Sequence, residues 1–182
     1  MIEGGSSSPD VAASTAGAHS FSKEAIGAAT SKLISARIGD IAVVFSRSAK
    51  HKHYSLADIE WLVLPAVFSG QFFVAEASNA ETGHRAPVAV ITWARVSPDV
   101  DRKLTENLGQ PMRLRPDEWS SGEIYWLIDT VGDRRAVVTA LTSLLEGLFK
   151  QRDVKVVSAD AQGRPRMELL RELAALVQPG AA

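Results

Sequence analysis

The sequence predicts a mixed α/β fold in which helices flank a mixed central β-sheet. Stretches with helical spacing of apolar residues alternate with short apolar runs of strand length over residues 22–158. Their order is helix, helix, strand, strand, helix, strand, helix, strand. Segments interleaved in this way commonly fold as a sheet that is covered by helices.

The first element is expected to be a long helix that starts at Ser22, whose hydroxyl can cap it. Apolar residues then recur at helical spacing, and they are Ile26, Ala29, Leu33, Ile34, Ile38, Ile41 and Val44. A second helix is expected over residues 56–67. Gly70 is expected to end it, because glycine is favoured just past a helix C-terminus.

Two strands follow, over residues 71–77 and 87–96. The polar turn between them predicts a hairpin. A short helix is expected over residues 99–108. Next come a strand over residues 124–130, a helix over 134–150 with one apolar stripe, and a strand over 154–158.

The last apolar pattern, over residues 166–177, has helical spacing at Met167, Leu169, Leu170, Leu173 and Val177. We favour a C-terminal helix there, and extended structure stays open as the alternative. Residues 1–21 are rich in Ser, Gly and Ala and poor in large apolar side chains, so we expect them to be disordered. Residues 22–182 are then one domain of ordinary size.

Composition excludes several classes of function. The formal net charge is −1 over 182 residues, which argues against binding nucleic acid through a concentrated basic surface. The chain has no cysteine, so a disulfide scaffold, a cysteine metal site and a cysteinyl acyl-enzyme are excluded. We expect no metal and no membrane span, and a cytoplasmic location.

Two segments carry the pattern of a reactive site. In residues 48–67, Ser48 stands three positions before His51, and an apolar helix then runs to Pro65. In residues 118–133, a strongly apolar strand ends on Asp129, and a lone carboxylate of this kind can orient a histidine. The two segments together indicate a histidine and aspartate centre for acyl transfer.

Both segments resemble the toxin-activating lysine acyltransferases, which acylate RTX cytolysins. The matching residues of the first segment are Ser48, His51, Lys52, Leu64, Pro65 and Ala66, and this register puts the family's catalytic histidine on His51 rather than on His53. The later matches are Pro87 to Ser97, Trp119, Ser121, Gly122, Trp126, Ile128 and Asp129, with Ile38 and Gly39 upstream. The likeness covers roughly residues 33–160.

This resemblance implies a GNAT-like acyltransferase fold and a homodimer. It implies transfer of a fatty acyl group from acyl-acyl carrier protein to the ε-amino group of internal lysines of an RTX-type protoxin. The donor is then a substrate, and we expect no bound cofactor. His51 and Asp129 fall on the family's catalytic histidine and aspartate.

The chemistry fits these residue types. A lysine amine, with a pKa near ~10.4, is mostly protonated at neutral pH, so a base must remove its proton. His51 is the candidate base, and Asp129 would fix its tautomer. Ser48 could hydrogen-bond the histidine or the thioester carbonyl, and an acyl group resting on Ser48 or His51 stays open. Gly122 supports the site mainly through structure, in a turn that needs an unusual backbone angle.

Other residues of these segments have plainer interpretations. Arg47, Lys50 and Lys52 form a basic rim that could dock an acidic acyl carrier protein, or could simply be solvated. His53 is expected to face solvent. No acidic or cysteine ligands accompany the two histidines, so a metal pair is disfavoured. Trp93, Trp119 and Trp126 are expected in the core or in a pocket wall.

The chain also departs from the family pattern. Leu62 stands where these enzymes commonly carry an asparagine that organises the oxyanion region. Three alternative functions stay open. One is a GNAT-like N-acyltransferase that uses acyl-CoA on another acceptor, although we find no glycine-rich pyrophosphate loop. Another is a non-catalytic module that binds acyl carrier protein or another protein. The third is a dimeric structural protein that uses the apolar helix faces.

Overall fold

The computed structural model describes residues 23–177. The disorder predicted for residues 1–21 lies outside the described residues. Five helices and strands of the first half are α1 (Lys23–Arg47), α2 (Leu56–Leu62), α3 (Leu64–Ser69), β1 (Phe72–Ser78) and β2 (Arg85–Val96). The remaining elements are α4 (Pro98–Glu106), η1 (Pro116–Glu118), β3 (Ile124–Gly132), α5 (Arg134–Glu146), β4 (Val154–Ala159), β5 (Pro165–Leu169) and α6 (Leu170–Val177).

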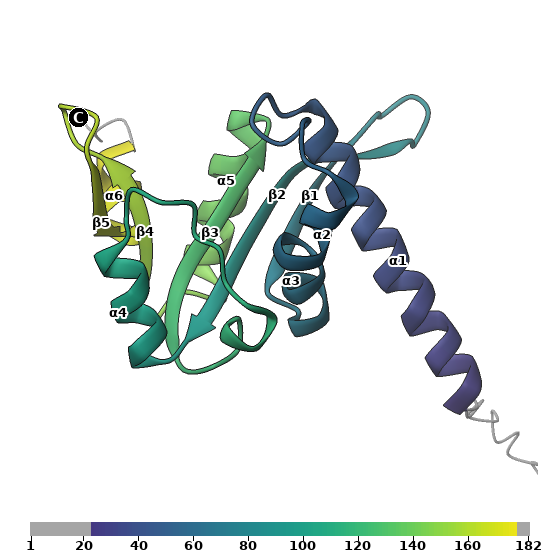
Figure 1. The fold of residues 1–182 in the computed structure, drawn as a ribbon. Coiled ribbons are helices and arrows are strands. Elements are labelled where there is room, and N and C mark those ends of the chain that lie inside the picture. Colours follow the sequence, from purple (N-terminus) through teal and green to yellow (C-terminus); the bar gives the residue numbers. More distant parts are fainter. Residues whose placement is uncertain (1–22, 178–182) are drawn as a thin grey trace, which may run out of the picture.

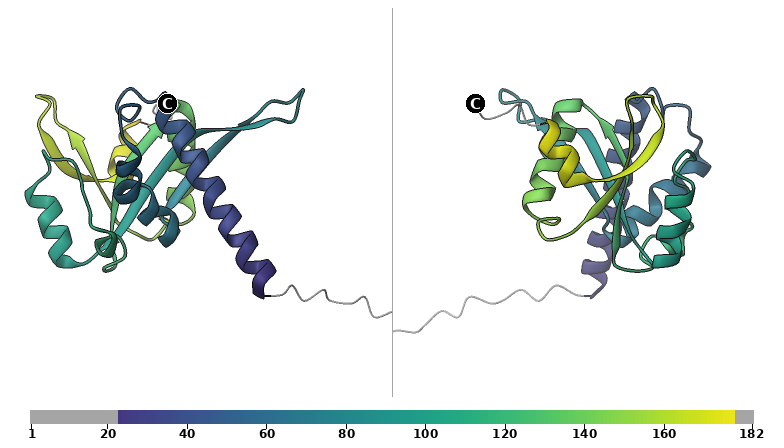
Figure 2. Two further views of the ribbon diagram at one scale, coloured as in Figure 1. Left: turned by 45° about the vertical axis from the view of Figure 1, so that its right-hand side comes forward. Right: turned by 90° about the vertical axis from the view of Figure 1, so that its left-hand side faces the viewer.

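The five strands form one sheet in the order β1-β2-β3-β4-β5. Neighbouring strands are antiparallel except β3 and β4, which are parallel. The sheet lies between helices, with α5 and α6 on one face and α2, α3 and α4 on the other (Figures 1 and 2). The predicted mixed α/β class, with a mixed sheet flanked by helices, is confirmed.

Helix α1 contacts the sheet only with its C-terminal part. Ile41, Val44 and Phe45 are buried against β2, β3 and the helices α2 and α3. The N-terminal part of α1 extends past the sheet (Figure 1), and Leu33 there is 63% exposed. The end of α1 at Arg47 is therefore held firmly against the sheet, and the segment that carries His51 starts from that fixed point.

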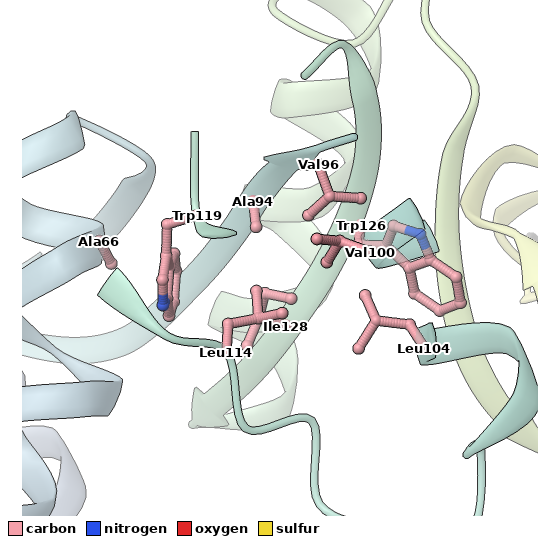
Figure 3. Close-up of a cluster of buried hydrophobic side chains, with 9 residues drawn as sticks. All are labelled: Ala66, Ala94, Val96, Val100, Leu104, Leu114, Trp119, Trp126 and Ile128. Carbon is pink, nitrogen blue, oxygen red and sulfur yellow. The ribbon is translucent and has the colours of Figure 1, made fainter. Parts of the chain in front are cut away.

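The core on the face of α3 and α4 is built around two tryptophans. Trp119 and Trp126 are almost fully buried, and Trp93 is buried on the opposite face, so the prediction of core tryptophans is confirmed. Figure 3 shows the side chains that meet between α3, α4 and the sheet. They are Ala66, Ala94, Val96, Val100, Leu104, Leu114, Trp119, Trp126 and Ile128.

The helix predicted over residues 56–67 is divided into α2 and α3 at Val63. Pro65 explains the break, because proline has no backbone N–H to donate and its ring clashes with the carbonyl four residues earlier in a continuous helix. Gly70 ends α3 with φ +68°, as predicted. The hairpin of β1 and β2 is also confirmed.

The predicted C-terminal helix is wrong in its first part. Residues Pro165–Leu169 form β5, which pairs antiparallel with β4, and only Leu170–Val177 are helical. Met167 of β5 packs against the core cluster that contains Trp119 and Trp126. Strand pairing therefore overrides the helical spacing of the side chains here.

Candidate active site

His51 lies in a short turn that follows α1. The backbone N–H groups of His51 and Lys52 both donate to the carbonyl of Ser48, at 3.2 and 2.9 Å. This single turn brings the side chains of residues 48 and 51 onto the same side. The imidazole is 3% exposed and lies between the rings of Phe45 and Tyr54, with centroids 4.5 and 5.1 Å away.

Both ring nitrogens of His51 have partners. Nδ1 lies 2.9 Å from Oγ of Ser48, and Nε2 lies 2.7 Å from Oδ2 of Asp129. An ionised carboxylate can only accept, so Nε2 carries the hydrogen and Nδ1 of the neutral ring accepts from the Ser48 hydroxyl. The three side chains form a chain of hydrogen bonds from hydroxyl through imidazole to carboxylate.

A bulge in β3 directs Asp129 toward His51. Thr92 of β2 pairs with Asp129, whereas the next residue, Trp93, pairs with Leu127, so Ile128 is an extra residue in β3. The extra residue shifts the alternation of side chains between the two faces of the sheet. Asp129 therefore shares the face of α1 and not the face of α5, on which Leu127 packs.

The carboxylate of Asp129 is largely buried, with 13% of its side chain exposed. Burial alone would raise its pKa, but the hydrogen bond from His51 and the charge of Lys50 outweigh burial and hold the pKa below its ordinary value. The Nζ atom of Lys50 lies 3.4 Å from both carboxylate oxygens, and the backbone N–H of Thr130 donates to Oδ1 at 3.0 Å. Asp129 is therefore an anion at neutral pH.

Next to Asp129 the sheet opens. The parallel strands β3 and β4 pair only at Tyr125 with Val154 and at Trp126 with Lys155, and beyond those pairs they separate. A cavity of about 310 Å³ lies there, which we call the β3–β4 cavity. Its lining residues are Lys50, Tyr54, Trp61, Leu62, Leu108, Gln110, Pro111, Met112, Leu127, Ile128, Asp129, Thr130, Val156 and Val157.

His51 itself lines a different and smaller hollow. This hollow has a volume of about 190 Å³ and runs between α1 and α2. Tyr54 lines both spaces and so lies next to the histidine and next to the β3–β4 cavity. Ser48 lines a third hollow, of about 460 Å³, next to Gly132. The hydrogen-bonded chain from Ser48 to Asp129 thus runs between three openings.

The three residues of the predicted basic rim line three different hollows. Lys50 lines the β3–β4 cavity beside Asp129, whereas Lys52 lines the small hollow beside His51. Arg47 lines the hollow beside Ser48 and donates to the carbonyl of Pro87 at 3.5 Å. His53 is exposed, as predicted.

Gly122 lies before β3, and Asp129 lies near the other end of that strand. The unusual backbone angle predicted for Gly122 is wrong, because its φ is not positive. A Cβ atom there would lie 2.4 Å from the carbonyl oxygen of Val96, so glycine is required by close packing of two backbones. The residue fixes the start of β3 and is not part of the hydrogen-bonded group.

Sequence reasoning missed several residues of the cavity wall. Tyr54 and Trp61 follow His51 closely in the sequence, and Trp61 donates to Asp58 at 3.0 Å. The loop at residues 108–112 crosses from α4 to the same cavity, and no motif marks it. An aromatic residue three positions after a candidate histidine was the one available signal.

Within the described range 23–177, no group of three histidine, cysteine or acidic side chains is arranged as a metal site would require. Over the same range, none of the helices has the length and apolar character that a membrane span needs.

Comparison with known proteins gives the family. The family model described as HlyC, the RTX toxin acyltransferase family, matches residues 32–170, which is more than half of the chain. The chain belongs to the RTX toxin acyltransferase family. The matched range contains Ser48, His51 and Asp129, together with all five strands.

Curated relatives of this family member carry matching names. The protein-lysine myristoyltransferase RtxC of Kingella kingae is 25% identical over 131 residues, which cover 70% of this chain and 72% of the relative. The leukotoxin-activating lysine-acyltransferase LtxC of Aggregatibacter actinomycetemcomitans is 29% identical over 94 residues, 52% of this chain and 51% of the relative. The RTX-I toxin-activating lysine-acyltransferase ApxIC of Actinobacillus pleuropneumoniae is 26% identical over 103 residues, 55% of each chain. The match thus spans about half the length of LtxC and ApxIC.

Proposed function

We propose that this chain is a protein-lysine acyltransferase that activates an RTX-type protoxin. It would transfer a fatty acyl group from acyl-acyl carrier protein to the ε-amino group of internal lysines of that protoxin. The observation that carries the proposal is the hydrogen-bonded group of Ser48, His51 and Asp129 beside an open cavity, in a member of this family. Relatives whose names specify lysine acylation support the acceptor class.

His51 is the proposed base. The lysine ammonium first loses one proton to solvent. The neutral amine then attacks the carbonyl carbon of the donor thioester, a C–N bond forms, and an electron pair moves onto the carbonyl oxygen. His51 takes the proton that the nitrogen loses, and Asp129 stabilises the imidazolium through its bond with Nε2. The carbonyl then re-forms, the C–S bond breaks, and the thiolate leaves with that proton as the free thiol of the carrier.

The proton must reach Nδ1 of His51, because Nε2 is engaged by Asp129. Nδ1 faces the hydroxyl of Ser48, so the amine would either displace this hydroxyl or pass its proton through it. The same geometry is compatible with an acyl group that rests on Ser48, with His51 as base and Asp129 as the orienting carboxylate. A burst of acyl-enzyme without acceptor is expected only for this covalent route.

The β3–β4 cavity is the proposed binding site for the acyl thioester. Most of its lining side chains are apolar, including Leu108 and Met112 from the loop and Val156 and Val157 from β4. Apolar wall residues suit a chain of methylenes, and the polar groups of the same cavity can hold its reactive end in one place. Asp129 and Lys50 form the polar part of this cavity, where the carbonyl would lie.

Two further features belong to the proposal. A cytoplasmic location would give the enzyme access to an acyl carrier protein, and a homodimer would follow the implication of the family resemblance. The acidic carrier would approach the basic residues Arg47, Lys50 and Lys52, of which Lys50 is nearest to the cavity.

Intact-mass spectrometry of a candidate RTX-type protoxin tests this function. The protoxin is incubated with the enzyme and either long-chain acyl-acyl carrier protein or acyl-CoA of the same chain length. We expect a mass increase of one acyl group per modified lysine with the carrier donor. Transfer from acyl-CoA alone would favour the general N-acyltransferase reading, and binding of the carrier without transfer to any acceptor would favour a non-catalytic module.

A further inference from the structure

Lys50 has a position that its neighbours in the basic rim lack. Of the described residues that line the β3–β4 cavity, Lys50 alone is basic. Its Nζ atom is 3.4 Å from each oxygen of Asp129, and 66% of its side chain is exposed. The ammonium is thus anchored beside the reactive group at one end of the cavity while it can still move.

The separation between Lys50 and Asp129 is longer than in a tight ion pair, in which charged donors and acceptors approach to about 2.7–2.9 Å. Asp129 already receives hydrogen bonds from His51 at 2.7 Å and from the backbone of Thr130 at 3.0 Å. The carboxylate therefore does not depend on Lys50 for its position. The lysine can turn toward a second anionic oxygen without freeing Asp129.

Of the described residues that line the cavity, Tyr54, Gln110 and Thr130 carry neutral donors, and only Lys50 carries a positive charge. The indole N–H of Trp61 is committed to Asp58. Attack on a thioester puts a full negative charge on the carbonyl oxygen, and a transition state of this kind requires a positioned donor or cation. Leu62 cannot serve as one.

We propose that Lys50 binds the carbonyl oxygen of the donor thioester and stabilises the oxyanion that forms during acyl transfer. This inference rests on the proposed function, and it gives Lys50 a catalytic role in place of a purely docking one. When the amine attacks, the C=O electron pair moves to oxygen beside the ammonium, and it returns when the C–S bond breaks. Lys50 keeps its proton throughout.

A docking role and a catalytic role predict different responses to the donor. Docking concerns the carrier protein, so its loss raises KM for acyl-acyl carrier protein and leaves a small donor unaffected. Stabilisation of an oxyanion concerns the thioester, so its loss lowers kcat with every donor. A small thioester, acyl-N-acetylcysteamine, has neither the carrier protein nor its phosphate and separates the two.

The experiment measures kcat and KM for wild type, Lys50→Met, Lys50→Arg and Lys32→Met with both donors. Lys32 is an exposed lysine of α1 and serves as the matched control. We expect Lys50→Met to lower kcat about 10- to 100-fold with both donors, which is below the usual loss of about 10²- to 10³-fold because Lys50 is largely exposed. Lys50→Arg should restore most of the rate, and Lys32→Met should match wild type.

A binding measurement makes the inference independent of turnover. A long-chain phosphonate analogue carries the tetrahedral geometry and the negative charge of the intermediate, and a carboxamide analogue is neutral. Lys50→Met should weaken binding of the phosphonate about 10-fold or more and leave the carboxamide unchanged. Lys50→Arg should bind both as wild type does.

Three results would overturn the inference. Unchanged kcat in Lys50→Met would show that no charge is needed at this position. A defect seen only with the carrier donor, as a raised KM, would make Lys50 a docking residue. Equal loss of affinity for both analogues would point to a structural role. Wild type could bind the phosphonate more tightly than Lys50→Met does and yet acylate no acceptor. That result would contradict the proposed function and would still support an anion-binding role for Lys50.

Discussion

Asp101 and Asp129 each contact a ring N–H and a lysine, but the ring is an indole at Asp101 and an imidazole at Asp129. Asp101 of α4 accepts from the indole Nε1 of Trp126 at 2.8 Å and from Nζ of Lys155 at 2.6 Å. Asp129 likewise has one ring N–H and one lysine as partners, which are His51 at 2.7 Å and Lys50 at 3.4 Å.

The difference lies in the ring. An indole N–H is a donor that does not exchange its role at any ordinary pH, whereas an imidazole can take up and release a proton. At Trp126 and Lys155 the strands β3 and β4 are paired, and α4 is fixed to them through Asp101. At Asp129 the strands have separated and a cavity lies beside the carboxylate. The first cluster is thus a structural connection, and the second is suited to chemistry.

Neutralising Asp129 should cause the largest loss of activity. Asp129→Asn keeps the shape of the side chain but removes the charge that stabilises a protonated His51. We expect acyl transfer to fall about 10²- to 10⁴-fold, with the fold retained. Initial rates from intact-mass spectrometry, with far-UV circular dichroism as the folding check, measure this effect. A variant as active as wild type would contradict the role of Asp129.

Neutralising the other aspartate should have the opposite profile. Asp101→Asn leaves Lys155 without its ion-pair partner between α4 and the strands. We expect the free energy of unfolding to fall by about 1–3 kcal/mol, with kcat near that of wild type where the variant is folded. Urea denaturation measures the loss. Asp99→Asn, whose side chain is 85% exposed, is the matched control and should change stability by less than about 0.5 kcal/mol. An unchanged free energy of unfolding in Asp101→Asn would contradict the structural role of Asp101.

Ser48 separates the two routes for acyl transfer. The Ser48 hydroxyl could serve only to position the His51 ring or to pass a proton to its Nδ1. In that case Ser48→Ala should lower kcat about 10-fold, since a single hydrogen bond is lost. If the acyl group rests on Ser48, the same change should abolish transfer. Single-turnover rates with and without acceptor distinguish the outcomes, and a donor-dependent acyl adduct on Ser48 would contradict direct attack.

The smallest expected effect concerns stability in acid. The pKa of Asp129 is lowered in the folded protein, so the unfolded chain binds more protons as pH falls. The stabilisation from this group is fully present above the unfolded carboxyl pKa of about 3.9 and is lost as pH falls through the lower folded value. Asp129→Asn should therefore flatten the loss of stability below pH 4, which urea titrations across that range would measure. An unchanged slope would show that Asp129 is not held by its partners.

The sequence predicted much of this site because its signals are local or are shared with a family. The turn from Ser48 to His51 depends on three neighbouring positions, and the resemblance identified Asp129 as the partner. The bulge at Ile128 could not be predicted, since residues 124–128 are all apolar and show no alternation between faces. Strict alternation would have put Asp129 on the face of α5.

The cavity and the C-terminal strand also depend on long-range contacts. Pairing of β3 with β4 stops after Trp126 and Lys155, and no residue pattern in either strand predicts where it stops. Met167 fits a helical pattern, but pairing with Val157 of β4 satisfies its backbone and buries its side chain. The spacing of apolar residues indicates which side chains are buried, but it does not indicate which strands form backbone hydrogen bonds with each other.

Two nearby histidines provide the most direct test of the proposed base. His51 is buried between Ser48 and Asp129, and His53 is exposed two residues later. Intact-mass spectrometry of the acceptor after incubation with acyl-acyl carrier protein is compared for wild type, His51→Ala and His53→Ala. We expect acylation by wild type and by His53→Ala, and a loss of about 10²-fold or more in His51→Ala. Equal activity of the two variants would contradict the proposed base.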